Sequence, residues 1–220
     1  MSGYSDYEKL MAEWGSAYLM PIVKNKESTL IDSSKHKSFS MIFYGFTEIS
    51  NTFEALSLSE VLIAVAPPRS NRINHDEYLK YLVNTYLQDV YILKERLNTY
   101  ATRLKRLYTK AGRVSLVSKH INPLFEFVKS SLEDIVKTRG YHVHASRYRD
   151  DELDRVCQMA LISRYDPEAK KHYRFSYQKA QKAWAARIKS NNASTKKLLD
   201  YYFKEISKVV SENGNVFMSL

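Results

Sequence analysis

The chain of 220 residues carries 34 Lys and Arg against 24 Asp and Glu, a formal net charge of +10, and 44% of its residues are hydrophobic. Such a composition is typical of a globular protein with one substantial core and argues against wholesale disorder. The single cysteine, Cys157, excludes an internal disulfide and a cage of thiolate metal ligands.

The first predicted helix begins at the Ser5–Glu8 capping box, continues at three- and four-residue apolar spacing, and stops before Pro21. Residues 22–34 are polar and are expected to form a connection. A second helix is predicted from His36 to about Leu58, because its apolar residues fall mainly on one face.

The apolar run from Leu58 to Ala66 is compatible with a short helix or a strand, and Pro67-Pro68 ends it. A loop is expected over residues 67–74. The longest predicted helix follows and covers most of residues 76–110, since three-four apolar spacing continues there until Gly112. Such a helix serves as the scaffold of a bundle.

The remaining helices are marked by their caps. Asn122-Pro123 begins a helix that runs to about Thr138, and Asp150 to Glu152 begin another that ends near Tyr165. A further helix is expected from Asp166-Pro167-Glu168 to about Lys189, and a last one from Ser194 or Thr195 to Gly214.

Helices of this kind bury their apolar stripes against one another, so the predicted fold is an all-α bundle of about six to eight helices with one very long central helix. Only 6 Gly and 5 Pro occur, which also favours helix over sheet. We expect a single domain over residues 1–214, with residues 1–68 as an alternative N-terminal lobe, and a frayed tail over residues 215–220.

The segment Arg139-Gly140-Tyr141-His142-Val143-His144 combines a permanent cation, two imidazoles and a helix breaker within six residues. Arg binds phosphate oxygens, and His transfers protons near neutral pH. Together they suffice for RNA cleavage without a metal. The structural alternative is a helix end whose polar residues only cap and solvate it.

The pattern Arg139-x4-His144, between helical elements of a basic all-α chain, resembles the Arg-x4-6-His motif of the HEPN superfamily. The resemblance implies a helical bundle, often of a prokaryotic toxin or phage-defence system, acting as a metal-independent ribonuclease. It also implies a homodimer that joins two motifs in one cleft. Arg139 would then bind the scissile phosphate and His144 would transfer a proton, whereas active members favour a polar residue at the position of Gly140.

Helix geometry leaves the choice of histidine open. Residues five apart on a regular helix are displaced by about 140° around the axis, so Arg139 and His144 converge only if the helix bends, which Gly140 permits. His142 lies about 60° from Arg139 and is a rival proton carrier. The two histidines are about 200° apart and cannot chelate one metal from a regular helix.

Basic residues elsewhere predict contact with a polyanion. Residues 94–119 hold eight Lys or Arg against Glu95, and residues 166–210 hold eleven against four acids. Arg147, Arg149 and Tyr141 are candidate RNA contacts beside the motif, although the two arginines would equally pair with the nearby acids. The interleaved tyrosines are either base-stacking platforms or bundle core, with Tyr108, Tyr173 and Tyr177 as the examples.

No nucleophile elbow, phosphate loop or dinucleotide fingerprint occurs, so no cofactor or metal is expected. The longest apolar run is too short to cross a bilayer, and a cytoplasmic location is expected. Two hypotheses remain. One is a HEPN-like ribonuclease of a toxin–antitoxin or phage-defence system, working as a homodimer on RNA and controlled by an antitoxin or regulatory protein. The other is a non-enzymatic helical module that binds nucleic acid or a protein through basic faces.

Overall fold

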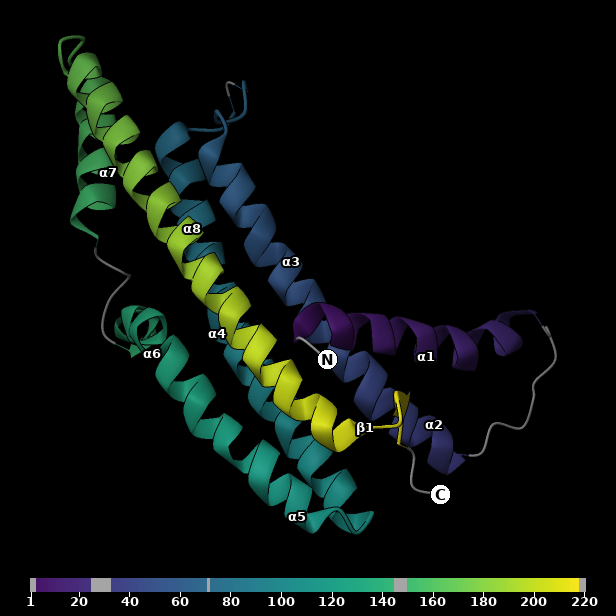
Figure 1. The fold of residues 1–220 in the computed structure, drawn as a ribbon. Coiled ribbons are helices and arrows are strands. Elements are labelled where there is room, and N and C mark those ends of the chain that lie inside the picture. Colours follow the sequence, from purple (N-terminus) through teal and green to yellow (C-terminus); the bar gives the residue numbers. More distant parts are fainter. Residues whose placement is uncertain (1–2, 25–32, 71, 145–149, 218–220) are drawn as a thin grey trace. The chain divides into compact units, whose positions relative to one another are not determined.

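A computed structural model of the protein describes residues 3–24, 33–70, 72–144 and 150–217, without the side chains of 33–35, 134 and 136–144. The described chain is almost entirely helical, which confirms the predicted all-α class. Its elements are α1 (Tyr4–Lys24), α2 (Ser33–Phe39), η1 (Ser40–Tyr44, a π-helical turn), α3 (Gly45–Ala64), α4 (His75–Lys110), α5 (Val114–Leu116), η2 (Val117–Ile121, also π-helical), α6 (Asn122–His144), α7 (Asp151–Ser163), α8 (Ala169–Val210), β1 (Ser211–Glu212) and β2 (Asn215–Val216) (Figure 1).

The chain forms two compact units made of segments that are separated in sequence. Unit 1 comprises residues 1–51, 93–132 and 195–220, and unit 2 comprises residues 52–92 and 133–194. The expected single domain over residues 1–214 stays a prediction.

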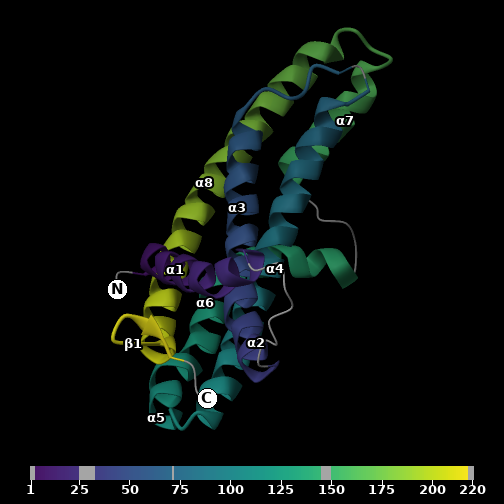
Figure 2. The same ribbon diagram turned by 90° about the vertical axis from the view of Figure 1, so that its right-hand side faces the viewer.

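Aromatic side chains fill the core of unit 1. Tyr7 and Tyr100 are buried, and their hydroxyl oxygens lie 2.6 Å apart in a hydrogen bond between α1 and α4. The Phe203 ring of α8 stacks on the Tyr7 ring with centroids 4.8 Å apart. Tyr202 donates its hydroxyl proton to the Leu97 carbonyl at 2.7 Å, so α4 and α8 pack closely here (Figure 2). Gly45 allows this packing, because a Cβ there would lie 2.6 Å from Cδ2 of Tyr100.

Two amide side chains of α8 hold α3 in unit 2. The Gln181 amide donates to the carbonyls of Ile63 and Val65, each at 3.0 Å, and so satisfies carbonyls at the end of α3. The Asn192 amide donates to the Leu56 carbonyl at 3.0 Å and to the Glu60 carboxylate at 2.9 Å. These bonds place α3 and α8 side by side.

The predicted long helix over residues 76–110 is confirmed as α4, but it is not the longest helix. Residues 169–210 form one helix of 42 residues, so the predicted break between Lys189 and Ser194 or Thr195 was wrong. Cap-type residues occur there, yet Thr195 and Asn192 are buried inside the helix. Tertiary contacts override their local preference for helix ends.

Two prolines lie within helices instead of ending or starting them. α1 continues past Pro21 to Lys24, contrary to the predicted stop. Helix is also present before Pro123, because α5 and η2 precede α6 directly. Pro123 has no N–H to donate to the carbonyl of Lys119, and the wide turn of η2 lies where that bond is missing. The run from Leu58 to Ala66, left open between helix and strand, continues α3 as helix to Ala64.

The end of the chain is a small hairpin in place of the predicted helix and frayed tail. α8 ends at Val210, and β1 pairs antiparallel with β2 across a turn at Asn213 and Gly214, both with positive φ. Asn-Gly is the preferred pair for this type of two-residue turn. The prediction of a frayed tail was wrong for residues 215–217. Asn215 and Val216 form β2, and the Phe217 N–H donates to the Val210 carbonyl at 2.8 Å.

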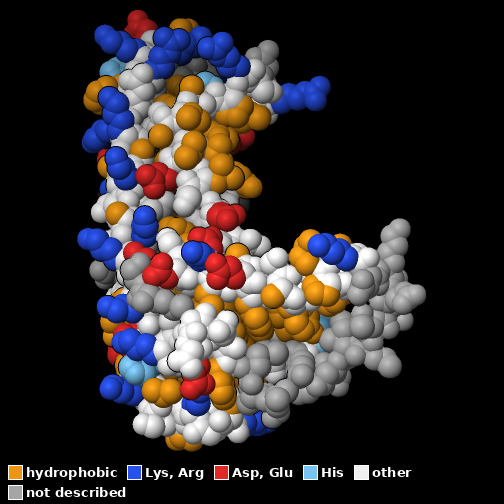
Figure 3. Space-filling view, turned by 45° about the vertical axis from the view of Figure 1, so that its right-hand side comes forward, with side chains coloured by type: hydrophobic (Ala, Val, Ile, Leu, Met, Phe, Trp, Pro, Cys, Tyr) orange, Lys and Arg blue, Asp and Glu red, His pale blue; other side chains and the backbone are white. Residues whose placement is uncertain are grey.

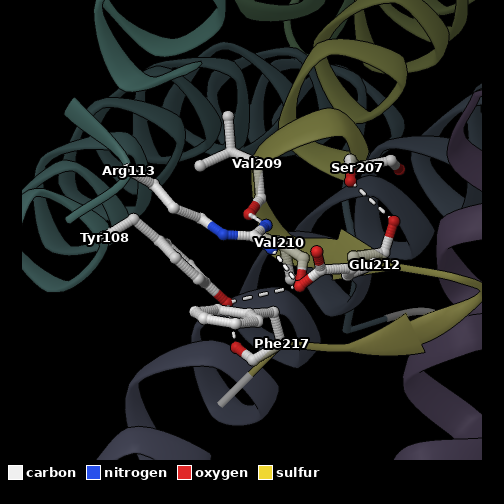
Figure 4. A network of polar contacts seen from close by, with 8 residues as sticks. Tyr108, Arg113, Ser207, Val209, Val210, Glu212 and Phe217 are labelled. Atoms are coloured by element: carbon white, nitrogen blue, oxygen red, sulfur yellow. Dashed lines mark hydrogen bonds and ion pairs between the residues drawn. The ribbon is translucent and has the colours of Figure 1, made fainter. Parts of the chain in front are cut away.

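Arg113 and Tyr108 clamp this hairpin to the end of α4 (Figure 4). The Arg113 guanidinium donates to the Val209 carbonyl at 2.7 Å, forms an ion pair with Glu212 and lies 3.7 Å from the centre of the Phe217 ring. The Tyr108 hydroxyl donates to the Phe217 carbonyl at 3.0 Å. Arg113 thereby satisfies a carbonyl that the end of α8 leaves without a helical partner.

Candidate nucleic-acid interface

The first three quarters of α8 contain no acidic residue. Between Ala169 and Leu199 there are nine basic residues, and the neighbouring acids along the chain are Glu168 and Asp200. The nine are Lys170, Lys171, Arg174, Lys179, Lys182, Arg187, Lys189, Lys196 and Lys197. A surface helix normally mixes both signs, so this run indicates a surface suited to a polyanion.

Four of these cations share one outward face of α8 in unit 2. Lys171, Arg174, Lys182 and Lys189 are exposed, and at 100° per residue each lies within about 60° of Lys171 around the axis. We call this set the α8 cationic face. Lys and Arg side chains line the α8 edge in Figure 3, with few Asp or Glu among them. In the described part of the chain, no ion pair joins the four cations to a carboxylate.

The basic residues of α8 that turn toward α7 are already neutralised. Arg187 donates to Asp150 at 3.0 Å, and Lys179 lies 3.9 Å from Glu152. Asp150 also accepts hydrogen bonds from the N–H groups of Glu152 and Leu153, which confirms its predicted capping of α7. Arg187 and Lys179 therefore have carboxylate partners within unit 2, whereas no ion pair is seen for the four cations of the α8 cationic face in the described part of the chain.

An exposed phenylalanine lies within the cationic face. Phe175 is 68% exposed and occupies the helical position about 40° from Lys171, one turn along α8. It also lines a cleft of about 570 Å³ between α7 and α8. Proteins that bind single-stranded nucleic acid combine a positively charged groove with aromatic rings on which bases stack.

The three tyrosines considered as stacking platforms are less exposed than Phe175. Tyr108 and Tyr177 are buried in the cores of their units, so of the two alternatives the bundle core holds for them. Tyr173 is half-buried, and desolvation raises its pKa to about 12. Phe175 was missed in the sequence analysis. Its helical spacing from Lys171 and Lys182, within a run without acidic residues, would have placed it on the same face as these cations.

The backbone of the Arg139–His144 segment forms the last turns of α6. The helix, expected to end near Thr138, continues through Gly140 to His144 without a break. Positions 139 and 144 are therefore about 140° apart around the axis, and positions 139 and 142 about 60° apart. The side chains of Arg139, Tyr141, His142 and His144 lie outside the described residues, as do Arg147 and Arg149.

A second titratable cluster lies in unit 1. His120 Nδ1 is 2.7 Å from a carboxylate oxygen of Glu205, whose other oxygen accepts a hydrogen bond from Lys208. Burial acts to raise the pKa of Glu205, but the hydrogen bonds from Lys208 and His120 lower it below its usual value. Because the side chains of His120 and Glu205 are only 11% and 13% exposed, this cluster ties η2 to α8 and offers little access to a substrate.

Other chemistries find little support. Burial raises the pKa of the Cys157 thiol, which disfavours a nucleophilic thiolate. Among the described residues, no three His, Cys, Asp or Glu side chains form a group that could hold a metal ion. None of the described helices has the length and apolar content needed to cross a membrane.

Comparison with protein-family models, curated proteins and solved structures gives no match for this chain. The relation to the HEPN superfamily remains an expectation carried by the residues of the Arg139–His144 segment.

Proposed function

We propose that the protein binds RNA along the α8 cationic face. The observation that carries the proposal is the row of Lys171, Arg174, Lys182 and Lys189, which is exposed and has no carboxylate partner in the described part of the chain. Cations held on one helix face bind successive phosphates and release the counterions condensed on them. RNA is the polyanion of choice because the Arg139–His144 segment carries the groups suited to RNA chemistry.

Binding of single-stranded RNA, measured by fluorescence anisotropy at several salt concentrations, tests the proposal. If four cations contact phosphates, the logarithm of affinity should fall with the logarithm of salt concentration with a slope of about −3. The double variant Lys182→Glu/Lys189→Glu should weaken binding by about ten-fold or more and lower the slope by about 1 to 2.

The matched control is Lys9→Glu/Lys129→Glu. It changes the net charge equally, but Lys9 and Lys129 each lie near a glutamate of their own helix, Glu13 and Glu126. We expect this variant to bind RNA within about two-fold of the wild type, since Lys9 and Lys129 belong to unit 1 and are not part of the α8 cationic face. Equal losses in both variants would reduce the effect to net charge and contradict a defined interface.

We propose as a second function that the protein cleaves RNA as a metal-independent, HEPN-like ribonuclease. The observation that favours it is that the Arg139–His144 segment forms the last turns of α6 within an all-α fold, the fold class that the resemblance implies. Arg139 would bind the phosphate. The unbroken helix favours His142 over His144 as its partner within one copy, and a homodimer would bring two motifs together.

An RNA cleavage assay with a chelator present tests the ribonuclease. Replacement of the proton carrier should lower the rate by about two to four decades and leave RNA binding intact. His142→Ala and His144→Ala are assayed side by side to identify that residue, and Arg139→Ala should lower both rate and affinity. Wild-type protein that binds RNA but leaves it uncut with and without divalent metal would contradict the enzyme and leave a binding module. Activity in a strictly monomeric protein would contradict the homodimer.

A further inference from the structure

The cleft between α7 and α8 has an aromatic ring on one wall and carboxylates on the other, with one cation on each wall. Phe175 and Lys179 line it from α8, and Asp151, Asp154 and Arg155 line it from α7. Its volume of about 570 Å³ exceeds that of a single nucleobase several-fold. Both walls belong to unit 2, and Phe175, which lines the cleft, lies about 40° around the α8 axis from Lys171 of the α8 cationic face.

Phe175 is the residue that needs an explanation. A ring that is 68% exposed gains little from folding, and the outward positions around it carry Lys171 one turn before and Lys182 two turns after. Stacking of a base on an aromatic ring contributes about 1–3 kcal/mol and tolerates every base, since each base has a π face. Lys171 and Lys182, on either side of the ring along α8, would contact the phosphates that flank a stacked base.

The carboxylates of the opposite wall fit the edge of a base better than a phosphate. Asp151 and Asp154 would repel phosphate, but a carboxylate accepts hydrogen bonds from the amino group of cytosine. Uracil carries a carbonyl oxygen at that position, which a carboxylate repels. Adenine carries a comparable amino group on its pairing edge.

We infer that this cleft binds one unpaired nucleobase of RNA, stacked on Phe175 with its amino edge toward the carboxylates of Asp151 and Asp154. The inference rests on the RNA binding proposed above and adds to it a preference for single strands and for cytosine over uracil. In duplex RNA the base is stacked and paired, so the cleft receives only unpaired nucleotides.

The test compares fluorescently labelled oligocytidylate, oligouridylate and duplex RNA of equal length, bound to wild type and to two single variants. Phe175→Leu keeps an apolar side chain but removes the ring, and should weaken binding of oligocytidylate by roughly 5- to 100-fold. Its affinity for duplex RNA should stay within about two-fold of wild type. Tyr81→Leu is the matched control, because Tyr81 is 66% exposed in the same unit but does not line the cleft.

Asp154→Asn gives the second measurement. Wild type should bind oligocytidylate several-fold more tightly than oligouridylate, and Asp154→Asn should remove this preference while keeping binding itself. Circular dichroism and urea unfolding confirm that each variant is folded.

The possible outcomes separate the two proposals. If wild type binds RNA but Phe175→Leu binds single strands as tightly as wild type does, the nucleobase site is overturned and RNA binding by the α8 cationic face stands. If wild type binds none of the three RNAs, both are overturned. Binding to vesicles of anionic phospholipid that depends on Phe175, without any effect of Phe175→Leu on RNA, would also overturn the nucleobase site and identify a lipid surface as the ligand.

Discussion

The charged side chains of α8 differ between its two parts. From Ala169 to Leu199 the helix has no acid, and the cations of its outward face have no carboxylate partner in the described chain. From Asp200 to Val210 both carboxylates are bonded: Asp200 accepts the N–H of Tyr4 at 3.1 Å, and Glu205 binds His120 and Lys208.

This contrast separates residues that stabilise the fold from residues available to a ligand. In the second part, both carboxylates and the buried rings of Tyr202 and Phe203 have partners inside unit 1, so changing them should cost stability. In the first part, the outward residues contact solvent, so changing them should cost binding and little else. Three matched pairs of substitutions test the contrast, from the largest expected effect to the smallest.

Phe203 and Phe175 form the first pair. Phe203 is fully buried among the rings of Tyr7 and Phe46, and Phe203→Ala should lower the free energy of unfolding by about 3–5 kcal/mol. Phe175→Ala should change it by less than about 0.5 kcal/mol, because the ring is largely exposed. Urea unfolding measures both. A large loss of stability in Phe175→Ala would mean that the ring packs against the protein, and the contrast would fail.

Arg113 and Arg187 form the second pair. Arg113→Gln should cost about 2 kcal/mol, because it leaves the Val209 carbonyl without its charged donor and removes the cation from the Phe217 ring. Arg187→Gln should cost at most about 1 kcal/mol, since the Arg187 side chain is 49% exposed and Asp150 keeps its hydrogen bonds from the N–H groups of Glu152 and Leu153. Thermal unfolding that shifts equally in both variants would contradict this order.

Tyr202 and Tyr173 form the third pair, and the measured quantity is the free energy of unfolding at alkaline pH. Burial raises the pKa of Tyr202 well above its usual value of 10.0 and that of Tyr173 to about 12. Above pH 10 the unfolded chain loses these protons and the folded chain keeps them, so stability is full below pH 10 and falls as pH rises. Each tyrosine adds at most about 1.4 kcal/mol per pH unit to this loss.

The measurement is the free energy of unfolding between pH 9 and 13 in the two Phe variants. Tyr202→Phe should flatten the alkaline loss across this whole range. Tyr173→Phe should flatten it only up to about pH 12, where Tyr173 itself titrates in the folded protein. A wild-type curve that stays level through this range would show that these hydroxyls titrate without unfolding.

Periodicity and caps were sufficient for much of the fold. The apolar spacing of residues 76–110 predicted α4, and Asp150 predicted the start of α7, because both signals are local. Asn192 is an example of a residue whose position in the fold cannot be predicted from the neighbouring sequence. Its amide favours a helix end, but in the folded chain it binds Leu56 and Glu60 from another helix, and no window of sequence around residue 192 contains that partner.

The candidate interface was only partly predictable for a related reason. The excess of cations over residues 166–210 was visible, but whether a cation is paired depends on segments far away in sequence, such as Asp150 for Arg187. Aromatic residues raise the same difficulty: Tyr177 and Phe175 are two positions apart, and only helix register decides which of them is buried. The Asn213-Gly214 turn, by contrast, was a local signal that could have been used.

The way unit 1 is assembled along the chain has a consequence for its synthesis. Residues 195–220 pack with residues 1–51, and the bond between Tyr4 and Asp200 joins positions 196 apart in sequence. During translation, residues 52–92 and 133–194 have all emerged before residue 195, so unit 2 can assemble on the ribosome while α1 still lacks the Phe203 ring that it packs against. Unit 1 should therefore complete its fold only after residues 195–210 have emerged, because the apolar face of α1 lacks part of its core until then.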